Sequence, residues 1–282
     1  MKDEKEYAFL KRTQIAGMNC HYIRYSLKYF LEQQAKLGIE SVALWGGAPH
    51  IRLDQRGHSD SKKIRRLAKD LGIHFTCFTA ASCTYHYQYC ASGEDYARSR
   101  AYFIQGLQMA HELEIPYMAM NSGWGFWNEE REEAWKRSRE MLWEVACEAE
   151  KLGITLTMES LRRAESQLVY RLEDAVRMER EVNHPNLKIM IDTTAMAVAG
   201  EHMESWFDTF GSKICNLHFV DGTPYGHLAW GDGNRDLTQY MNCLRENHYE
   251  GQLGLELTDS RYLMHPEEAD RRCLKALEPY IV

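Results

Sequence analysis

A strand-like segment followed by a helix-like segment recurs eight times along the chain, and this repeat is the strongest constraint on its fold. The predicted strands are short apolar runs that begin near Gln14, Ser41, His74, Tyr117, Ile154, Leu187, Ile214 and Gln252. Successive starts lie 27 to 43 residues apart, which is the length that one strand, one helix and two loops require. Amphipathic patterns between the strands predict helices over residues 26–37, 61–71, 96–113, 131–152, 172–182, 201–210, 237–247 and 266–280.

Local signals support the ends of several of these helices. Gly38, Gly72 and Gly153 each follow a leucine that closes a helical pattern, and a new strand begins soon afterwards. Glycine readily adopts the left-handed conformation that ends a helix. Asp60 or Ser61 is expected to cap the second helix, and Pro266 suits the first turn of the last one.

Apolar strands that alternate with helices are typical of a parallel sheet. Eight such units predict an α/β protein, a single (β/α)8 TIM barrel that occupies residues 1–282 as one domain. At about 150 residues per domain the length would suggest two domains, but α/β barrels of about 250 residues are single domains. A doubly wound open sheet is the alternative, although the first strand lacks the GxGxxG turn of that fold.

Composition narrows the classes of function. The 41 acidic residues outnumber the 34 basic ones, which disfavours a nucleic-acid partner. The charged first segment lacks an apolar signal core, and no apolar run reaches the roughly 18 residues of a membrane span. Eight cysteines without a CxxC pair argue against a disulfide scaffold or an all-cysteine zinc site. We therefore expect a cytoplasmic protein that binds neither nucleic acid nor membranes.

Polar residues at the ends of the last four strands form the candidate site. Glu159, Asp192, His218 and Glu256 each interrupt an apolar run at or near a strand end, and the carboxyl ends of barrel strands carry the active site. A single carboxylate there is more often a helix cap or an ion-pair partner, so the prediction rests on the set. Three carboxylates and one imidazole predict a site for one divalent cation, Mn²⁺ in our interpretation, with Co²⁺ or Mg²⁺ as alternatives.

These four residues, in this order, resemble the metal ligands of the xylose isomerase-like barrel superfamily of sugar isomerases and epimerases. Glu165 resembles the second glutamate that binds substrate in ketose 3-epimerases. The segment 44–51 (LWGGAPHI), the pair Cys20-His21 and the aromatic loop Thr84-Tyr85-His86-Tyr87 are similar to the fructoselysine 3-epimerase branch.

Two positions depart from the psicose type of ketose 3-epimerase. That type carries a histidine three residues after the strand-six aspartate, where this chain has Ala195. It also carries an arginine six residues after the strand-seven histidine, where this chain has Pro224. These departures disfavour a free sugar bound in the psicose manner and leave the fructosamine branch open.

The resemblance implies a metal-dependent sugar epimerase or isomerase with Glu159 and Glu256 as catalytic residues. Two glutamates on opposite faces of a substrate carbon can remove and return a proton next to a ketose carbonyl, which inverts that carbon. If one glutamate both removed and returned the proton, or if a hydride moved between neighbouring carbons, the result would be aldose–ketose isomerisation. No lysine ends a strand, which disfavours a Schiff base.

Loop residues supply the predicted contacts to a small sugar or sugar conjugate. Aromatic faces bind sugar rings, although tryptophans at loop tips also suit contacts within a homo-oligomer, which we expect to be a dimer or tetramer. The predicted substrate contacts are His21, Trp45, His50, Trp124, Glu165 and His227.

Other activities of the superfamily remain alternatives. They are inosose dehydration, hydroxypyruvate isomerisation, and the catalytic subunit of a C-glycoside-cleaving enzyme, which would need a second, smaller subunit. A metal-stabilised binding subunit is the non-enzyme alternative. Apurinic-site endonucleases bind three metal ions through additional ligands, and this chain offers one four-ligand set.

Overall fold

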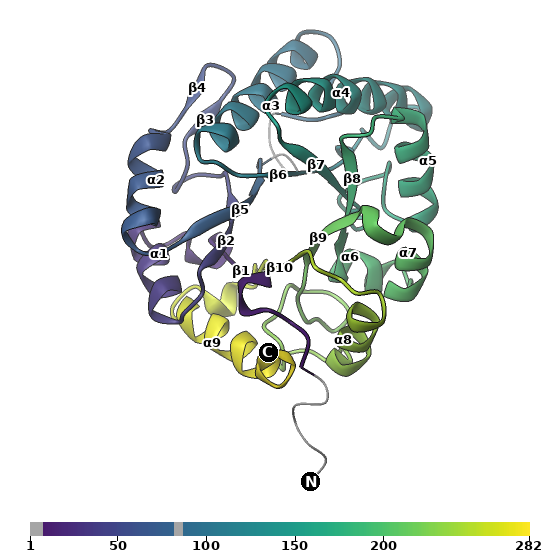
Figure 1. Cartoon of the computed structure of the whole chain (residues 1–282). Coiled ribbons are helices and arrows are strands. Elements are labelled where there is room, and N and C mark those ends of the chain that lie inside the picture. The colour runs from purple at the N-terminus through teal and green to yellow at the C-terminus, as the bar shows by residue number, and fades with distance from the viewer. Residues whose placement is uncertain (1–7, 82–86) are drawn as a thin grey trace.

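Eight parallel strands close into a barrel in the computed structural model, which describes residues 8–81 and 87–282 (Figure 1). The order around the barrel is β1-β10-β9-β8-β7-β6-β5-β2. This closure confirms the predicted TIM barrel and excludes the open sheet. The barrel strands are β1 (Ile15–Met18), β2 (Ser41–Trp45), β5 (His74–Thr79), β6 (Tyr117–Met120), β7 (Thr155–Glu159), β8 (Leu187–Asp192), β9 (Ile214–His218) and β10 (Gln252–Leu255).

Helices surround the barrel on the outside (Figure 1). They are α1 (Leu27–Lys36), α2 (Ser61–Asp70), α3 (Glu94–Glu112), α4 (Arg131–Lys151), α5 (Leu172–Val182), α6 (Thr193–Val198), α7 (Met203–Phe210), α8 (Leu237–Glu246) and α9 (Pro266–Leu277). Gly38, Gly72 and Gly153 have φ values of 68°, 71° and 69°, so the predicted glycine stops are confirmed. Asp60 is the residue that caps α2, because its carboxylate accepts a hydrogen bond from the backbone N–H of Lys63.

Two small elements were not predicted. The hairpin of β3 (Leu53–Asp54) and β4 (Gly57–His58) follows β2. Its two-residue strands are too short to show the alternation of apolar and polar residues that predicts a strand. Helix α6 begins directly after Asp192 and has six residues, fewer than a helical pattern needs to be recognised. Thr84, Tyr85 and His86 of the aromatic third loop lie outside the described residues.

The interior of the barrel and the shell around it are packed differently. Small and flexible side chains meet inside the barrel, among them Ala16, Met18, Ala43, Ala119 and Met190. Larger buried side chains fill the space between the strands and the helices, among them Trp135, Trp206 and Phe103. Because a filled barrel leaves no central pore, a binding site forms at one end.

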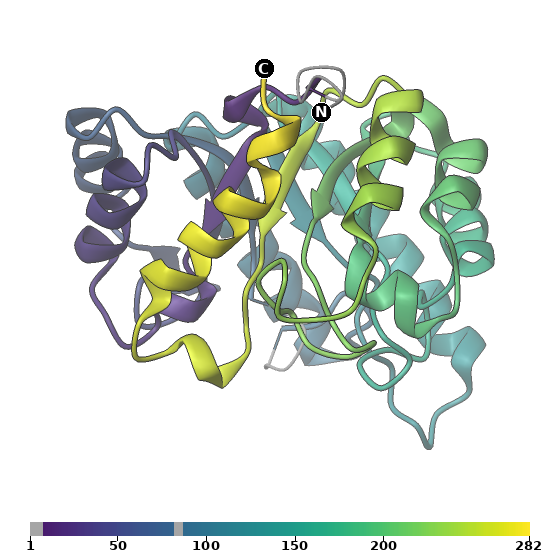
Figure 2. The ribbon, with the colours of Figure 1, turned by 90° about the horizontal axis from the view of Figure 1, so that it is seen from below.

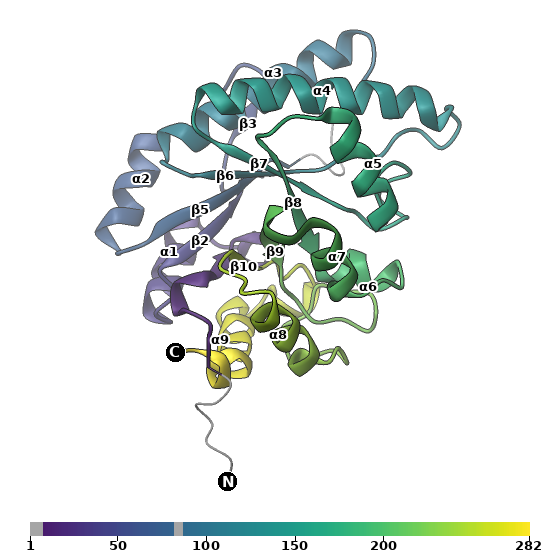
Figure 3. The ribbon, with the colours of Figure 1, turned by 45° about the vertical axis from the view of Figure 1, so that its right-hand side comes forward.

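The two ends of the barrel have different roles. Figure 2 shows the C-terminus at one end and the long loops that follow the strands at the other. Leu10 pairs with Ile281 beside the amino ends of the strands. Figure 3 shows α3 and α4 running side by side along the outside of β6 and β7. Within residues 8–81 and 87–282, none of the helices combines the length and apolar character that a membrane-spanning segment requires.

Candidate metal centre

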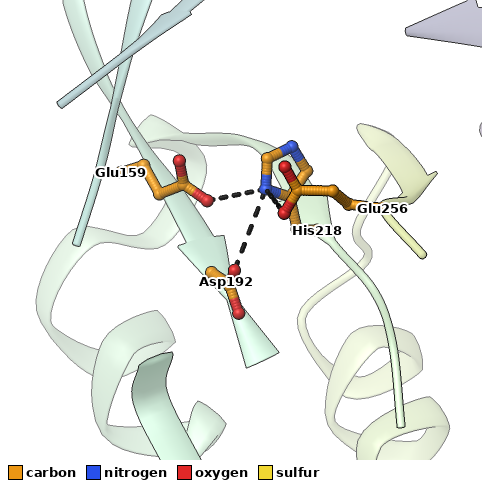
Figure 4. Close-up of side chains that lie close together, drawn as sticks. All are labelled: Glu159, Asp192, His218 and Glu256. Carbon is orange, nitrogen blue, oxygen red and sulfur yellow. Dashed lines mark hydrogen bonds and ion pairs between the residues drawn. The ribbon is translucent and has the colours of Figure 1, made fainter. Parts of the chain in front are cut away.

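The four predicted ligands converge at the carboxyl end of the barrel (Figure 4). Glu159, Asp192 and His218 are the last residues of β7, β8 and β9, and Glu256 directly follows β10. Asp192 pairs with His218 in the sheet register, which places both at one level of the barrel. One ligand atom from each of the four residues lies within 4.8 Å of the others.

His218 lies at the centre of the cluster. Its Nδ1 atom lies 2.6 Å from Oε1 of Glu159, 3.0 Å from Oε2 of Glu256 and 3.9 Å from Oδ2 of Asp192. Only 2% of its surface is exposed. The barrel therefore brings three carboxylates and one imidazole nitrogen to a single buried point.

Asp192 serves the local fold and the cluster at the same time. Its Oδ1 atom caps α6 and accepts hydrogen bonds from the backbone N–H groups of Thr194 and Ala195, at 2.5 and 3.0 Å. Its Oδ2 atom faces His218. The helix cap therefore fixes the orientation of the carboxylate that the cluster uses.

The cluster concentrates negative charge in a buried place. Burial, with the charges of Glu256 and Asp192, raises the pKa of Glu159 to about 7 despite the imidazole of His218. Burial alone would lower the pKa of His218, but the carboxylates of Glu256 and Glu159 prevail and raise it well above its usual value. Burial would likewise raise the pKa of Glu256, and His218 and His227 hold that pKa below its usual range instead. The carboxylates thus favour positive charge at their centre.

A divalent cation meets that demand. Carboxylate oxygens and one imidazole nitrogen are the ligands that Mn²⁺, Co²⁺ and Mg²⁺ accept, and a buried group of carboxylates is costly unless a cation offsets its charge. The donor set therefore fits a single divalent ion held by Glu159, Asp192, His218 and Glu256.

A cavity of about 190 Å³ opens over the cluster. Glu159, Asp192 and Glu256 form part of its wall. Three of the predicted substrate contacts also line it, namely Trp45, Glu165 and His227. Ala195 lines it as well, so the position that departs from the psicose type lies inside the cavity.

His227 touches the cluster directly. Its Nε2 atom lies 3.3 Å from Oδ2 of Asp192, and its Nδ1 atom lies 2.9 Å from Oε2 of Glu256. These contacts raise the pKa of His227 to about 9, against the opposing effect of its burial. The sequence predicted a substrate contact, and the structure adds a second role, because His227 orients two of the candidate ligands.

Asp221 shapes the loop that carries His227. Its carboxylate is buried, and it accepts backbone hydrogen bonds from Gly222, Gly231, Gly233 and Arg235 at 2.7–3.1 Å. A Cβ atom on Gly233 would lie 2.3 Å from that carboxylate. The Gly231-Asp232-Gly233 turn, a weak phosphate-binding signal in the sequence, therefore folds around the carboxylate of Asp221.

Replacing Asp221 by asparagine is expected to destabilise the protein by about 3 kcal/mol, because the amide NH₂ group would face backbone donors in place of an acceptor. Urea unfolding measures this difference. Asp208→Asn on the exposed side of α7 is the matched control, with an expected change below about 0.5 kcal/mol. Equal stabilities for the two variants would contradict the role of Asp221.

The remaining predicted contacts do not line the cavity. His21 is fully buried, and its Nε2 atom lies 3.0 Å from Oδ1 of Asp270 on α9. His50 lies between the side chain of Asn19 and the backbone carbonyl of Tyr25, at 2.9 Å from each. Trp124 borders a separate cavity with Gln88. Among the described residues, His21 thus pairs with α9, and His50 contacts the side chain of Asn19, which holds the backbone of Trp45.

Sequence reasoning passed over other residues of the cavity wall. Asn121 directly follows β6, and Thr258 lies two residues after Glu256. Both satisfy the same strand-end criterion that identified the ligands, so it could have found them. Arg162, which from the sequence could either bind an anion or be solvated, also lines the cavity beside Glu165.

Two curated epimerases are similar to this chain in sequence. A fructoselysine 3-epimerase of Escherichia coli O157:H7 is 27% identical over 259 residues, which covers 91% of this chain and 94% of the relative. A D-psicose 3-epimerase of Agrobacterium fabrum is 29% identical over 214 residues, which covers 73% of this chain and 68% of the relative.

Solved structures share the fold. The D-psicose 3-epimerase of Clostridium cellulolyticum H10, solved with D-tagatose, superposes with a TM-score of 0.76 at 20% identity and covers 94% of this chain and 97% of its own. The model of the family described as "Xylose isomerase-like TIM barrel" matches residues 31–279, which span strands β2 to β10 and include all four candidate ligands. From this match and the closed eight-stranded barrel, the chain belongs to the xylose isomerase-like TIM barrel family.

Proposed function

We propose that the protein is a divalent-metal-dependent sugar epimerase that inverts the carbon next to a ketose carbonyl, with a ketose or a fructosamine as substrate and Mn²⁺ as the metal. The observation that carries this proposal is the set of four ligands around one point, with Glu159 and Glu256 both on the wall of the adjoining cavity. The names of the relatives, which are 3-epimerases, support the same reaction class.

Glu159 and Glu256 are placed to move a proton. Each contacts His218 through one carboxylate oxygen, Oε1 of Glu159 and Oε2 of Glu256. Among the described residues, no hydrogen bond is made to the other oxygen of either side chain, so that oxygen can reach a substrate carbon. The two side chains come from β7 and from the end of β10, with β8 and β9 between them. One glutamate removes the proton from one face and the other returns it to the opposite face.

The metal and the other residues have supporting roles. A bound divalent cation supplies a Lewis acid that lowers the cost of negative charge on the carbonyl oxygen. His227 holds the carboxylates of Asp192 and Glu256 in place. Glu165 faces the cavity, and Arg162 holds its carboxylate through the guanidinium and through the backbone N–H at 3.1 Å.

Glu165→Ala is expected to lower kcat/KM about tenfold while metal content stays unchanged, because the variant loses one charged hydrogen bond to a sugar hydroxyl. Steady-state kinetics and metal analysis of the purified variant check both parts. Glu173→Ala is the control, since Glu173 forms an exposed pair with Arg171 outside the cavity. Unaltered kinetics for Glu165→Ala would remove this residue from the substrate site.

Solvent exchange tests the proposed function as a whole. The metal-loaded enzyme is incubated in D₂O with ketoses, fructosamines, inososes and C-glycosides, and deuterium on carbon is measured by NMR. Deuterium on the inverted carbon of a ketose or fructosamine is the expected result. Elimination from an inosose, or cleavage of a C-glycoside, would identify the alternative enzymes. If none of these substrates exchanged deuterium, the remaining alternative would be a metal-stabilised binding subunit without enzymatic activity.

A further inference from the structure

A second cavity adjoins the one over the metal centre. It encloses about 320 Å³, and Trp45 and Ala81 line both cavities. Among the described residues, the loop after β2, the hairpin strand β3 and two tyrosines also line it, namely Pro49, Ile51, Arg52, Leu53, Tyr87 and Tyr102. A molecule bound at the cluster therefore lies next to the second cavity, with Trp45 and Ala81 at the border between the two.

The fold holds Trp45 rigidly between the two cavities. The side chain of Asn19 accepts a hydrogen bond from the Trp45 backbone N–H at 2.7 Å and donates one to its carbonyl at 3.0 Å. His50 in turn contacts that side chain. A Cβ atom on Gly47 would lie 2.0–2.3 Å from the indole ring, so only glycine at this position leaves room for the indole. The LWGG segment thus builds a shared wall.

The second cavity is apolar and aromatic. Tyr87 and Tyr102 stack with their ring centroids 4.1 Å apart, and the hydroxyl of Tyr102 donates to the carbonyl of Ala81 at 3.2 Å. Ile51 and Leu53 add aliphatic surface. Arg52 is the one charged side chain among the described lining residues, and it donates to the backbone carbonyl of His58 at 2.8 Å. An uncharged apolar group suits such a wall, whereas a cationic group would meet Arg52, and the carboxylate of Asp54 beside it is already paired with Arg52 at 3.4 Å.

We propose that this second cavity binds an uncharged aromatic group attached to the keto sugar, so that the enzyme prefers a sugar conjugate with an apolar arm over a free ketose. The cavity is large enough, since about 150 Å³ of apolar space holds a benzene molecule. The proposal rests on the proposed function for the sugar end of the substrate and assigns the chemistry of the other end.

Three probes test this assignment with the metal-loaded full-length enzyme. They are fructose, which has no arm, 1-anilino-1-deoxyfructose, which has an uncharged aromatic arm, and fructosyl-lysine, which has a charged arm. Calorimetry gives the Kd of each, and deuterium exchange gives kcat/KM. We expect the anilino compound to bind about tenfold more tightly than either other probe, because burying one aromatic ring is worth at least that factor.

A large side chain that fills the second cavity should remove the tighter binding of the anilino compound. Ala48 lines the cavity at its exposed side, and Ala48→Phe is expected to bring the ratio of the fructose Kd to the anilino Kd from about ten to about one. Arg56 lies in the turn between β3 and β4, outside the cavity, and Arg56→Glu should keep the ratio. A wild-type ratio near one, or an unchanged ratio in Ala48→Phe, would overturn the proposal.

The two measurements separate this inference from the proposed function. If no probe exchanges deuterium, the proposed reaction fails, and the Kd ratio still decides whether the second cavity binds the arm. If fructose and the anilino compound exchange and bind alike, the reaction stands and the assignment of the second cavity fails.

Discussion

Replacing Glu159 or Glu256 by glutamine is expected to lower the rate of epimerisation by about 10²–10⁴, the usual cost of losing a general acid or base. The amide oxygen of glutamine keeps a ligand atom for the metal, but the amide cannot accept the proton. Both side chains lie at the cluster and on the cavity wall, so neither change disturbs a distant part of the fold. Both variants should therefore fold and bind metal more weakly than the wild type.

Solvent exchange distinguishes the two glutamine variants. A variant that lacks only the proton-returning acid still removes the proton and washes deuterium into one epimer, whereas a variant that lacks the base exchanges nothing. Glu250→Gln is the control, because Glu250 is exposed and lies in the loop before β10, at the amino end of the barrel. Full activity of either Glu159→Gln or Glu256→Gln with metal bound would rule out the mechanism with two bases.

Removing the metal is expected to abolish activity and to lower the stability of the protein. A ligand at 100 times its Kd stabilises the folded state by about 2.7 kcal/mol, which appears as a rise in Tm when Mn²⁺ is added to chelator-treated protein. Asp192→Asn should lose most of this rise, because an amide removes one of the charges that bind the ion. Its amide oxygen can still accept the backbone hydrogen bonds that cap α6.

Asp236→Asn provides the matched control for that experiment. Asp236 caps α8 in the same way, with a hydrogen bond from the backbone N–H of Gln239 at 3.1 Å, and it is no part of the cluster. Its variant should keep the full Mn²⁺-induced rise in Tm. A rise in Asp192→Asn equal to that of the wild type would contradict the assignment of Asp192 as a metal ligand.

The sequence determined the barrel and the four ligand positions. Short apolar runs became the eight barrel strands, with starts within one residue of the predicted ones. The leucine-glycine stops set the ends of α1, α2 and α4 because glycine alone takes the required φ at little cost. A parallel barrel places all carboxyl strand ends on one face, so locating Glu159, Asp192 and His218 at strand ends was enough to bring them together.

Only the tertiary structure decided what the loop residues do. His21 and His50 follow strands at the same end as the ligands, yet His21 contacts Asp270, 249 positions further along the chain, and His50 contacts Asn19. His227 reaches Asp192 and Glu256 because Asp221 folds its loop inward. Strand and helix patterns arise from neighbouring residues and can be read locally. The partners of a loop side chain are set by the path of its backbone and by hydrogen bonds to distant segments, which no local pattern encodes.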